Sequence, residues 1–220
     1  MTSRRTLVAA AAAAALPAAA FAAGKPAGDW PPVEGKQYTV VRPPLALDAR
    51  PVLVHDFFAY TCPHCLQFAP SMEEYAKSVA GSDRIRIVPV PVAWSPKYEI
   101  FPRAYFAFEA LGRLKDLHLP FWEYVLRDEH DWPDAASMMR DVEAWAGKRG
   151  IDAETWNRTV RSFQVSGRSR RSELLWKSYQ IDSTPSVGVG GRYVTSPEMT
   201  VTRGACIETV EFLVNRLLKG

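Results

Sequence analysis

The sequence predicts an α/β fold in which a strand–helix–strand unit and a strand–strand–helix unit flank an all-helical insertion. Three observations support this. A buried strand, an amphipathic helix and a second strand follow one another between residues 51 and 90. Residues 101–179 show helical patterns and no convincing strand, and strand patterns return after residue 184. With 220 residues, of which 47% are hydrophobic and 23% charged, the chain is long enough to bury a substantial core.

The first 22 residues predict a secretory signal peptide and are excluded from the fold. Arg4 and Arg5 form a basic start, residues 7–20 are an Ala-rich apolar stretch, and Ala20-Phe21-Ala22 fits the small-x-small cleavage rule. The apolar stretch is shorter than the ~18 to 20 residues that a membrane-spanning helix needs. Removing this segment leaves 25 basic against 24 acidic residues. That near-neutral balance does not favour a nucleic-acid partner.

The first half of the chain predicts a βαβ unit after an extended lead-in. Residues 23–35 are rich in Pro and Gly and form the lead-in, and residues 36–41 predict a short strand. Residues 51–58, PVLVHDFF, are apolar on both faces, which indicates a central buried strand. Residues 84–90 predict the next strand, parallel to the first. Between them, apolar residues keep helical spacing: Phe68, Met72, Tyr75 and Val79.

The middle of the chain predicts five helices with a small apolar core of their own. The candidate segments are 102–114, 119–128, 134–150, 152–163 and 168–180. Asp134 and Asp152 are candidate N-caps, and Gly150 is a stop signal. Five of the seven tryptophans fall in this stretch, which favours a helical core over an exposed aromatic surface: Trp122, Trp132, Trp145, Trp156 and Trp176.

The C-terminal part predicts a β-hairpin and a final helix. Residues 186–190 and 191–195 are the two strands, and about 204–219 the helix. The helix has one apolar stripe, made of Cys206, Val210, Leu213 and Leu217. This place favours a buried, inert Cys206 over intermolecular pairing. The predicted domain thus has a first part at 36–97, the insertion at 98–167 and a second part at 168–220.

The other two of the three cysteines form a C-P-H-C motif at residues 62–65, at the junction of the buried strand and its helix. A structural zinc site usually needs four ligands, and the four histidines show no paired spacing. Covalent haem needs a His directly after the second Cys, where Leu66 stands. A structural disulfide would close a very small loop and stabilise little. Redox exchange therefore fits the motif best, without a metal.

The direction of the redox chemistry follows from the helix start. Cys62 is expected at the helix N-terminus, where free N–H groups and the macrodipole stabilise a thiolate. Pro63 suits the first helical position, and His64 adds a donor or a positive charge. These effects lower the pKa of Cys62. A stabilised thiolate makes the disulfide a stronger oxidant and Cys62 a better leaving group, so the motif favours donating disulfides.

Three segments carry a resemblance to a known family. Residues 57–70, FFAYTCPHCLQFAP, resemble the active-site segment of the DsbA family of periplasmic thiol:disulfide oxidoreductases. Residues 34–41, EGKQYTVV, look like that family's N-terminal strand, and residues 181–197 look like its cis-proline loop and hairpin. The resemblance covers nearly the whole chain after the signal peptide. It implies a thioredoxin fold carrying a helical insertion.

The resemblance also implies a substrate-binding loop. Thr184 and Pro185 stand where the family has its cis-proline, which faces the cysteine pair and offers backbone groups to a peptide substrate. An ordinary trans turn is the alternative.

Asp56 stands at the family's buried acidic position, where the family usually has Glu. On a strand, Val54, Asp56 and Phe58 share one face and His55 points to the other. A carboxyl in an apolar strand is expected to have a raised pKa, and it could relay the proton of Cys65. A strand-end acid with a salt-bridge partner is the alternative.

The function predicted from these residues is that of a monomeric periplasmic dithiol oxidase. Its Cys62–Cys65 disulfide would pass to reduced exported polypeptides through a mixed disulfide at Cys62. The resemblance implies reoxidation by a DsbB-type membrane partner and no dissociable cofactor. A disulfide isomerase or reductase is the nearest alternative, since Thr184 before the cis-proline is also seen in isomerases, although no N-terminal dimerisation domain is evident. A periplasmic chaperone whose helical insertion holds unfolded chains is the other.

Overall fold

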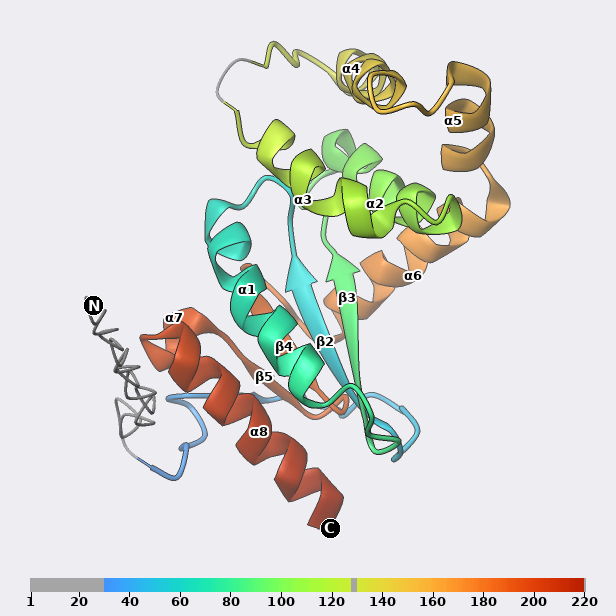
Figure 1. Cartoon of the computed structure of the whole chain (residues 1–220). Coiled ribbons are helices and arrows are strands. Elements are labelled where there is room, and N and C mark those ends of the chain that lie inside the picture. The colour runs from blue at the N-terminus through green and yellow to red at the C-terminus, as the bar shows by residue number, and fades with distance from the viewer. Residues whose placement is uncertain (1–29, 128–129, 220) are drawn as a thin grey trace, which may run out of the picture.

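A five-stranded mixed sheet forms the centre of the fold, with helices on both faces and a helical block at one end (Figure 1). The computed structural model describes residues 30–127 and 130–219, so the predicted signal peptide and most of the lead-in lie outside the described residues. The strand order is β1-β5-β4-β2-β3. The strands are β1 (Thr39–Val40), β2 (Val52–Phe58), β3 (Ile85–Pro91), β4 (Ser186–Val189) and β5 (Tyr193–Thr195).

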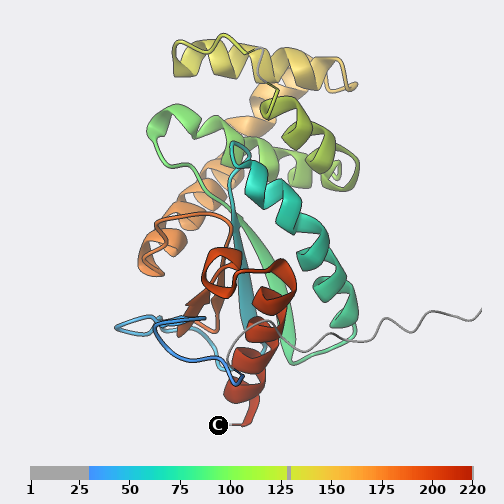
Figure 2. The same cartoon turned by 90° about the vertical axis from the view of Figure 1, so that its left-hand side faces the viewer.

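The helices divide into those that cover the sheet and those of the insertion. Figure 2 shows α6 on one side of the sheet and α1 on the other, where it packs with α8. The fold is therefore the predicted thioredoxin-like sheet with a helical insertion, formed by α2–α6. The helices are α1 (Pro63–Ser78), α2 (Ile100–Ala110), α3 (Leu114–Val125), α4 (Ala135–Gly147), α5 (Ala153–Val160), α6 (Phe163–Ser178), α7 (Pro197–Thr200) and α8 (Arg203–Lys219). None of the helices in the described part of the chain is long and apolar enough to cross a membrane.

Strand β2 is central, as its continuous apolar sequence predicts. It pairs in parallel with β3 and antiparallel with β4. Val54 packs into the core beneath α1 and α8, while Phe57 packs on the opposite face against Tyr179, at the end of α6. Because β2 and β3 are parallel, their carboxyl ends lie at the same edge of the sheet, and α1 begins there.

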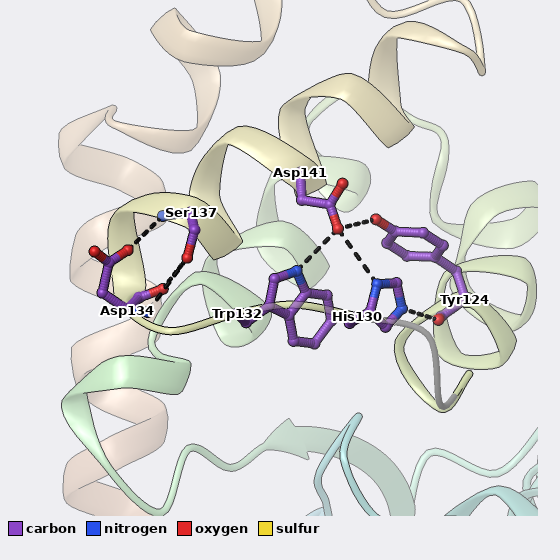
Figure 3. A network of polar contacts seen from close by, with 6 residues as sticks. All are labelled: Tyr124, His130, Trp132, Asp134, Ser137 and Asp141. Carbon is purple, nitrogen blue, oxygen red and sulfur yellow. Dashed lines mark hydrogen bonds and ion pairs between the residues drawn. The ribbon is translucent and has the colours of Figure 1, made fainter.

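The helical core predicted from the tryptophans is present, but it is shared with the end of β2 and the start of α1, since Phe58 and Cys65 belong to the same cluster. Trp122, Trp145 and Trp156 are buried in one cluster. Asp134 and Asp152 cap α4 and α5 as predicted, and Asp134 forms a capping box with Ser137 (Figure 3). Two helix boundaries were predicted wrongly. Helix α6 begins at Phe163 instead of at residue 168, because the Ser162 side chain caps it there. A helix over 102–114 and another from 119 were expected, but α2 ends at Ala110 and α3 already begins at Leu114.

The reason for this difference lies in the turn between α2 and α3. Gly112 has a φ of 69°, a conformation that ends a helix, so the residues after it belong to α3. The short helix α7 was also not predicted, although Ser196 and Pro197 form a recognisable start. The division of the domain at 97/98 and 167/168 stays a prediction, and its second boundary lies inside α6.

A polar network ties the segment before α4 to α3 (Figure 3). One carboxylate oxygen of Asp141 accepts hydrogen bonds from the Tyr124 hydroxyl at 2.7 Å and from the Trp132 indole N–H at 2.9 Å. The same oxygen lies 3.3 Å from Nδ1 of His130, whose ring stacks on Trp132. This network fixes the outer edge of the insertion.

Gly188 on β4 offers a test of packing between the sheet and α6. A Cβ added there would lie 2.5 Å from a ring atom of Tyr179 and 2.9 Å from a ring atom of Phe57. We expect Gly188→Ala to lower the free energy of unfolding by about 1 to 3 kcal/mol, because the rings must shift. Gly204→Ala is the control, since its Cβ meets open space. Urea denaturation measures both, and equal midpoints for the two variants would contradict this packing.

Candidate active site

The C-P-H-C motif starts α1 at the carboxyl edge of the parallel strands. Cys62 is the N-cap residue, and its Sγ accepts a hydrogen bond from the backbone N–H of Cys65 at 3.3 Å. Pro63 occupies the first turn, where its missing N–H leaves no helical bond unmade. The Cys62 N–H donates to the carbonyl of Ala59 at 3.0 Å, which closes the turn that follows β2. The predicted N-terminal position of Cys62 is confirmed.

The surroundings of Cys62 favour its thiolate. The pKa of Cys62 is lowered from 9.0 to about 6, first by the hydrogen bond from the Cys65 thiol. Burial opposes this shift, and the backbone N–H of Cys65 and the side chain of Thr184 support it. When protonated, the Cys62 thiol donates to the carbonyl of Thr184 at 3.2 Å. Cys62 is also partly exposed, so an incoming sulfur can reach it.

Cys65 differs from Cys62 in both its burial and its pKa. It is buried, and burial followed by the hydrogen bond to Cys62 raises the pKa of its thiol far above the ordinary value. Both thiols are free in this structure. The pair thus combines one accessible sulfur that ionises easily with one inner sulfur that holds its proton.

His64 lies directly after the first helical position. It is exposed, and its backbone N–H helps to lower the pKa of Cys62. The part predicted for the imidazole in stabilising the thiolate stays a prediction.

The loop before β4 faces Cys62, as the resemblance implies. The Thr184–Pro185 peptide bond is cis, so the ordinary trans turn is excluded. The Ser186 hydroxyl donates to the carbonyl of Ser183 at 2.9 Å and closes the loop across the proline. The carbonyl of Thr184 is thereby held at the sulfur of Cys62.

Asp56 lies on β2 between Pro89 of β3 and Val187 of β4. Burial raises its pKa from 3.8 to about 7. No basic side chain within residues 30–127 and 130–219 forms an ion pair with it, so the salt-bridge alternative is not supported. His55 points to the other face of the sheet, as alternation predicts, and lies 2.9 Å from the Tyr179 hydroxyl.

Cys206 is buried beneath the sheet, which confirms the position expected from the apolar stripe of α8. Burial raises the pKa of Cys206 to about 12. This thiol is therefore protonated and shielded at neutral pH.

Two aromatic residues near the site were not predicted from the sequence. The Tyr60 hydroxyl and Nδ1 of His118 are hydrogen-bonded at 2.6 Å, which joins the turn before Cys62 to α3. The Tyr179 hydroxyl accepts from the backbone N–H of Gly191 at 2.8 Å and contacts His55. These partners lie far apart in the sequence, so no local pattern indicates them.

The comparisons with known proteins agree with this geometry. A family model described as Thioredoxin matches residues 47–208. The chain is similar to the thiol:disulfide interchange protein DsbA of Bordetella parapertussis, with 33% identity over 74% of this chain and 75% of the relative. This chain belongs to the DsbA family. It is thus a thiol:disulfide oxidoreductase of that family, with its C-x-x-C motif at Cys62 and Cys65.

Further DsbA proteins match over more of the length. The DsbA of Burkholderia cepacia is 29% identical over 91% of both chains. The crystal structure of Pseudomonas aeruginosa DsbA superposes with a TM-score of 0.73 over 84% of this chain and 94% of that one, at 20% identity. NmDsbA1 from N. meningitidis gives a TM-score of 0.72 over 85% and 94%, at 24% identity. These two structures support the DsbA fold.

Proposed function

We propose that this DsbA-family protein is a periplasmic dithiol oxidase that donates its Cys62–Cys65 disulfide to exported polypeptides. The observation that carries the proposal is the asymmetry of the pair, with a lowered pKa at Cys62 and a raised one at Cys65. A thiolate that is stabilised in the reduced protein makes the reduced form more favourable. The disulfide form is therefore a strong oxidant.

The reaction proceeds in two thiol–disulfide exchanges. A substrate thiolate attacks Sγ of Cys62, the Cys62–Cys65 bond breaks, and Cys65 leaves with the bonding electrons and takes up a proton. A second substrate thiolate then attacks the substrate sulfur of the mixed disulfide. Cys62 leaves as a stabilised thiolate, the substrate has gained a disulfide, and the enzyme holds the two electrons.

Five other residues support these steps in the proposal. Asp56, with a pKa of about 7, exchanges the proton that Cys65 gains or loses. Pro63 fixes the start of α1, and His64 supplies its N–H to the Cys62 thiolate. Thr184 and Pro185 present backbone groups to an extended segment of substrate, which binds in the manner of an added strand.

We infer the partners and the compartment from the family. Relatives that match this chain carry the name thiol:disulfide interchange protein DsbA. We infer that reduced exported polypeptides are the substrates and that a DsbB-type membrane protein reoxidises Cys62 and Cys65. The protein acts as a monomer in the periplasm, after cleavage of its signal peptide near Ala22, which lies outside the described residues.

Equilibration with glutathione tests the proposal. We expect an oxidising reduction potential near the DsbA value of about −120 mV, and a value near the thioredoxin value of about −270 mV would overturn it in favour of a reductase. Rapid oxidation of a reduced, unfolded client should be lost in Cys62→Ser and kept in Cys206→Ser. Client folding that survives Cys62→Ser would instead support a chaperone. Reshuffling of scrambled disulfides faster than oxidation of thiols would support an isomerase.

A further inference from the structure

The turn between β2 and α1 contacts both cysteines through its backbone. The Cys62 N–H donates to the carbonyl of Ala59 at 3.0 Å. Although burial raises the pKa of Cys65, a backbone hydrogen bond from Ala59 lowers it. The position of this short turn therefore influences both sulfurs.

The side chain that holds this turn is Tyr60, which directly follows Ala59. Only 1% of Tyr60 is exposed, and its ring packs edge-on against Phe58 and Phe121. Its hydroxyl forms a hydrogen bond with Nδ1 of His118 at 2.6 Å. A buried hydroxyl that loses its partner is costly, so the position of Tyr60 depends on that histidine.

His118 belongs to α3, in the helical insertion. Its ring packs against Phe58, Tyr105 and Trp122, so the aromatic surroundings fix its orientation. Burial lowers the pKa of His118 to about 4, and the ring is neutral at physiological pH. The hydrogen bond between His118 and Tyr60 joins the insertion to the turn before Cys62.

We propose that Tyr60 and His118 form a positioning pair, through which the helical insertion sets the ionisation of Cys62. Neither residue touches the substrate. The pair holds the Ala59 turn, and the turn aligns the start of α1, whose N–H groups and inner thiol stabilise the Cys62 thiolate. The consequence for client oxidation rests on the proposed function, but the effect on ionisation does not.

Three variants test the pair. Tyr60→Phe and His118→Leu each remove the hydrogen bond and keep an apolar group, whereas His118→Asn keeps an acceptor and a donor on a short side chain. Thiolate absorbance of the reduced protein against pH gives the Cys62 ionisation constant. We expect this constant to fall roughly 3- to 10-fold in Tyr60→Phe and His118→Leu, and to recover in His118→Asn.

Tyr124→Phe is the matched control. Tyr124 lies on the same helix, and the change removes a side-chain hydrogen bond of similar length, to Asp141 (Figure 3). We expect this variant to lower the melting temperature without changing the ionisation of Cys62. A structural role alone for Tyr60 would give the same pattern in Tyr60→Phe, and that result would overturn the proposal.

The double variant Tyr60→Phe/His118→Leu provides a second measurement. If the two residues act as one unit, the double variant shifts the ionisation constant no further than a single variant does. Shifts that simply add would contradict a pair.

The test of the positioning pair is separable from the test of the proposed function. A protein that fails to oxidise clients, while its Cys62 ionisation still responds to these changes, overturns the oxidase proposal and leaves the positioning pair in place.

Discussion

Replacing Asp56 by asparagine is expected to stabilise the reduced protein by up to about 4 kcal/mol at about pH 8. Burial raises the pKa of this carboxyl from 3.8 to about 7. Each pH unit of difference corresponds to about 1.4 kcal/mol. At pH values above both pKa values, the folded protein bears the cost of a partly buried, desolvated carboxylate, and an asparagine of the same shape removes that charge.

The stability difference between Asp56→Asn and the original protein should grow as the pH rises. Below about pH 4 the carboxyl is protonated in the folded and the unfolded state, so the variant and the original protein should differ little. Between about pH 4 and 7 only the unfolded state releases the proton, and the original protein loses stability as the pH rises. Above about pH 7 the difference should stay constant.

Urea denaturation at several pH values checks this prediction, with Asp116→Asn as the control. Asp116 is exposed, and its hydrogen bond with Arg113 lowers its pKa. That replacement should therefore give no gain at high pH. We also expect Asp56→Asn to slow client oxidation, because the amide cannot exchange a proton with Cys65. A stability gain at Asp56 that is the same at every pH would contradict a buried titrating carboxyl.

Cys62 should ionise near pH 6, a roughly thousandfold larger ionisation constant than that of an ordinary thiol. The thiolate absorbance of the reduced protein, compared with the oxidised protein, measures it. The transition should disappear in Cys62→Ser and remain in Cys206→Ser, since burial keeps the pKa of Cys206 at about 12. A single transition near pH 9 would contradict the arrangement at the start of α1.

Cys65→Ala sharpens the test of Cys62. The thiol of Cys65 is the largest contributor to the low pKa of Cys62, so its removal should move the transition towards higher pH.

The low pKa of Cys62 also makes the stability of the reduced protein depend on pH. The pKa of Cys62 is lower in the folded than in the unfolded protein. Its contribution to the stability of the reduced protein is therefore complete above about pH 9 and is lost as the pH falls through about 6. The oxidised protein should lack this dependence.

The sequence indicated the parts of the site that depend on neighbouring residues. Pro63 after Cys62 predicts a helix start, and the structure has its N-cap there. The apolar run around Asp56 predicts a raised pKa, and burial raises it to about 7. Thr184-Pro185 was expected to be cis from the resemblance, and it is. In the first two cases adjacent residues indicate the local conformation or environment, whereas the cis bond was implied by the resemblance.

Long-range partners could not be predicted in this way. Tyr60 and His118 meet only because α3 packs over the end of β2. Likewise, Asp56 has no ion-pair partner within the described residues, and this depends on which strands lie beside it. The start of α3 was misplaced because Leu114 has the same apolar character in either helix, and the conformation of Gly112 decides between them.

The path of the chain through α6 has a mechanical consequence. Helix α6 carries the chain out of the insertion and leads directly, through residues 179–183, into the cis-proline loop (Figure 1). The cis-proline loop, whose Thr184 carbonyl contacts the Cys62 sulfur, is therefore covalently continuous with the helical block. The turn before Cys62 is joined to the same block through the hydrogen bond between Tyr60 and His118. Two backbone segments beside Cys62 are thus attached to the insertion, so a change in how the insertion packs would move both of them.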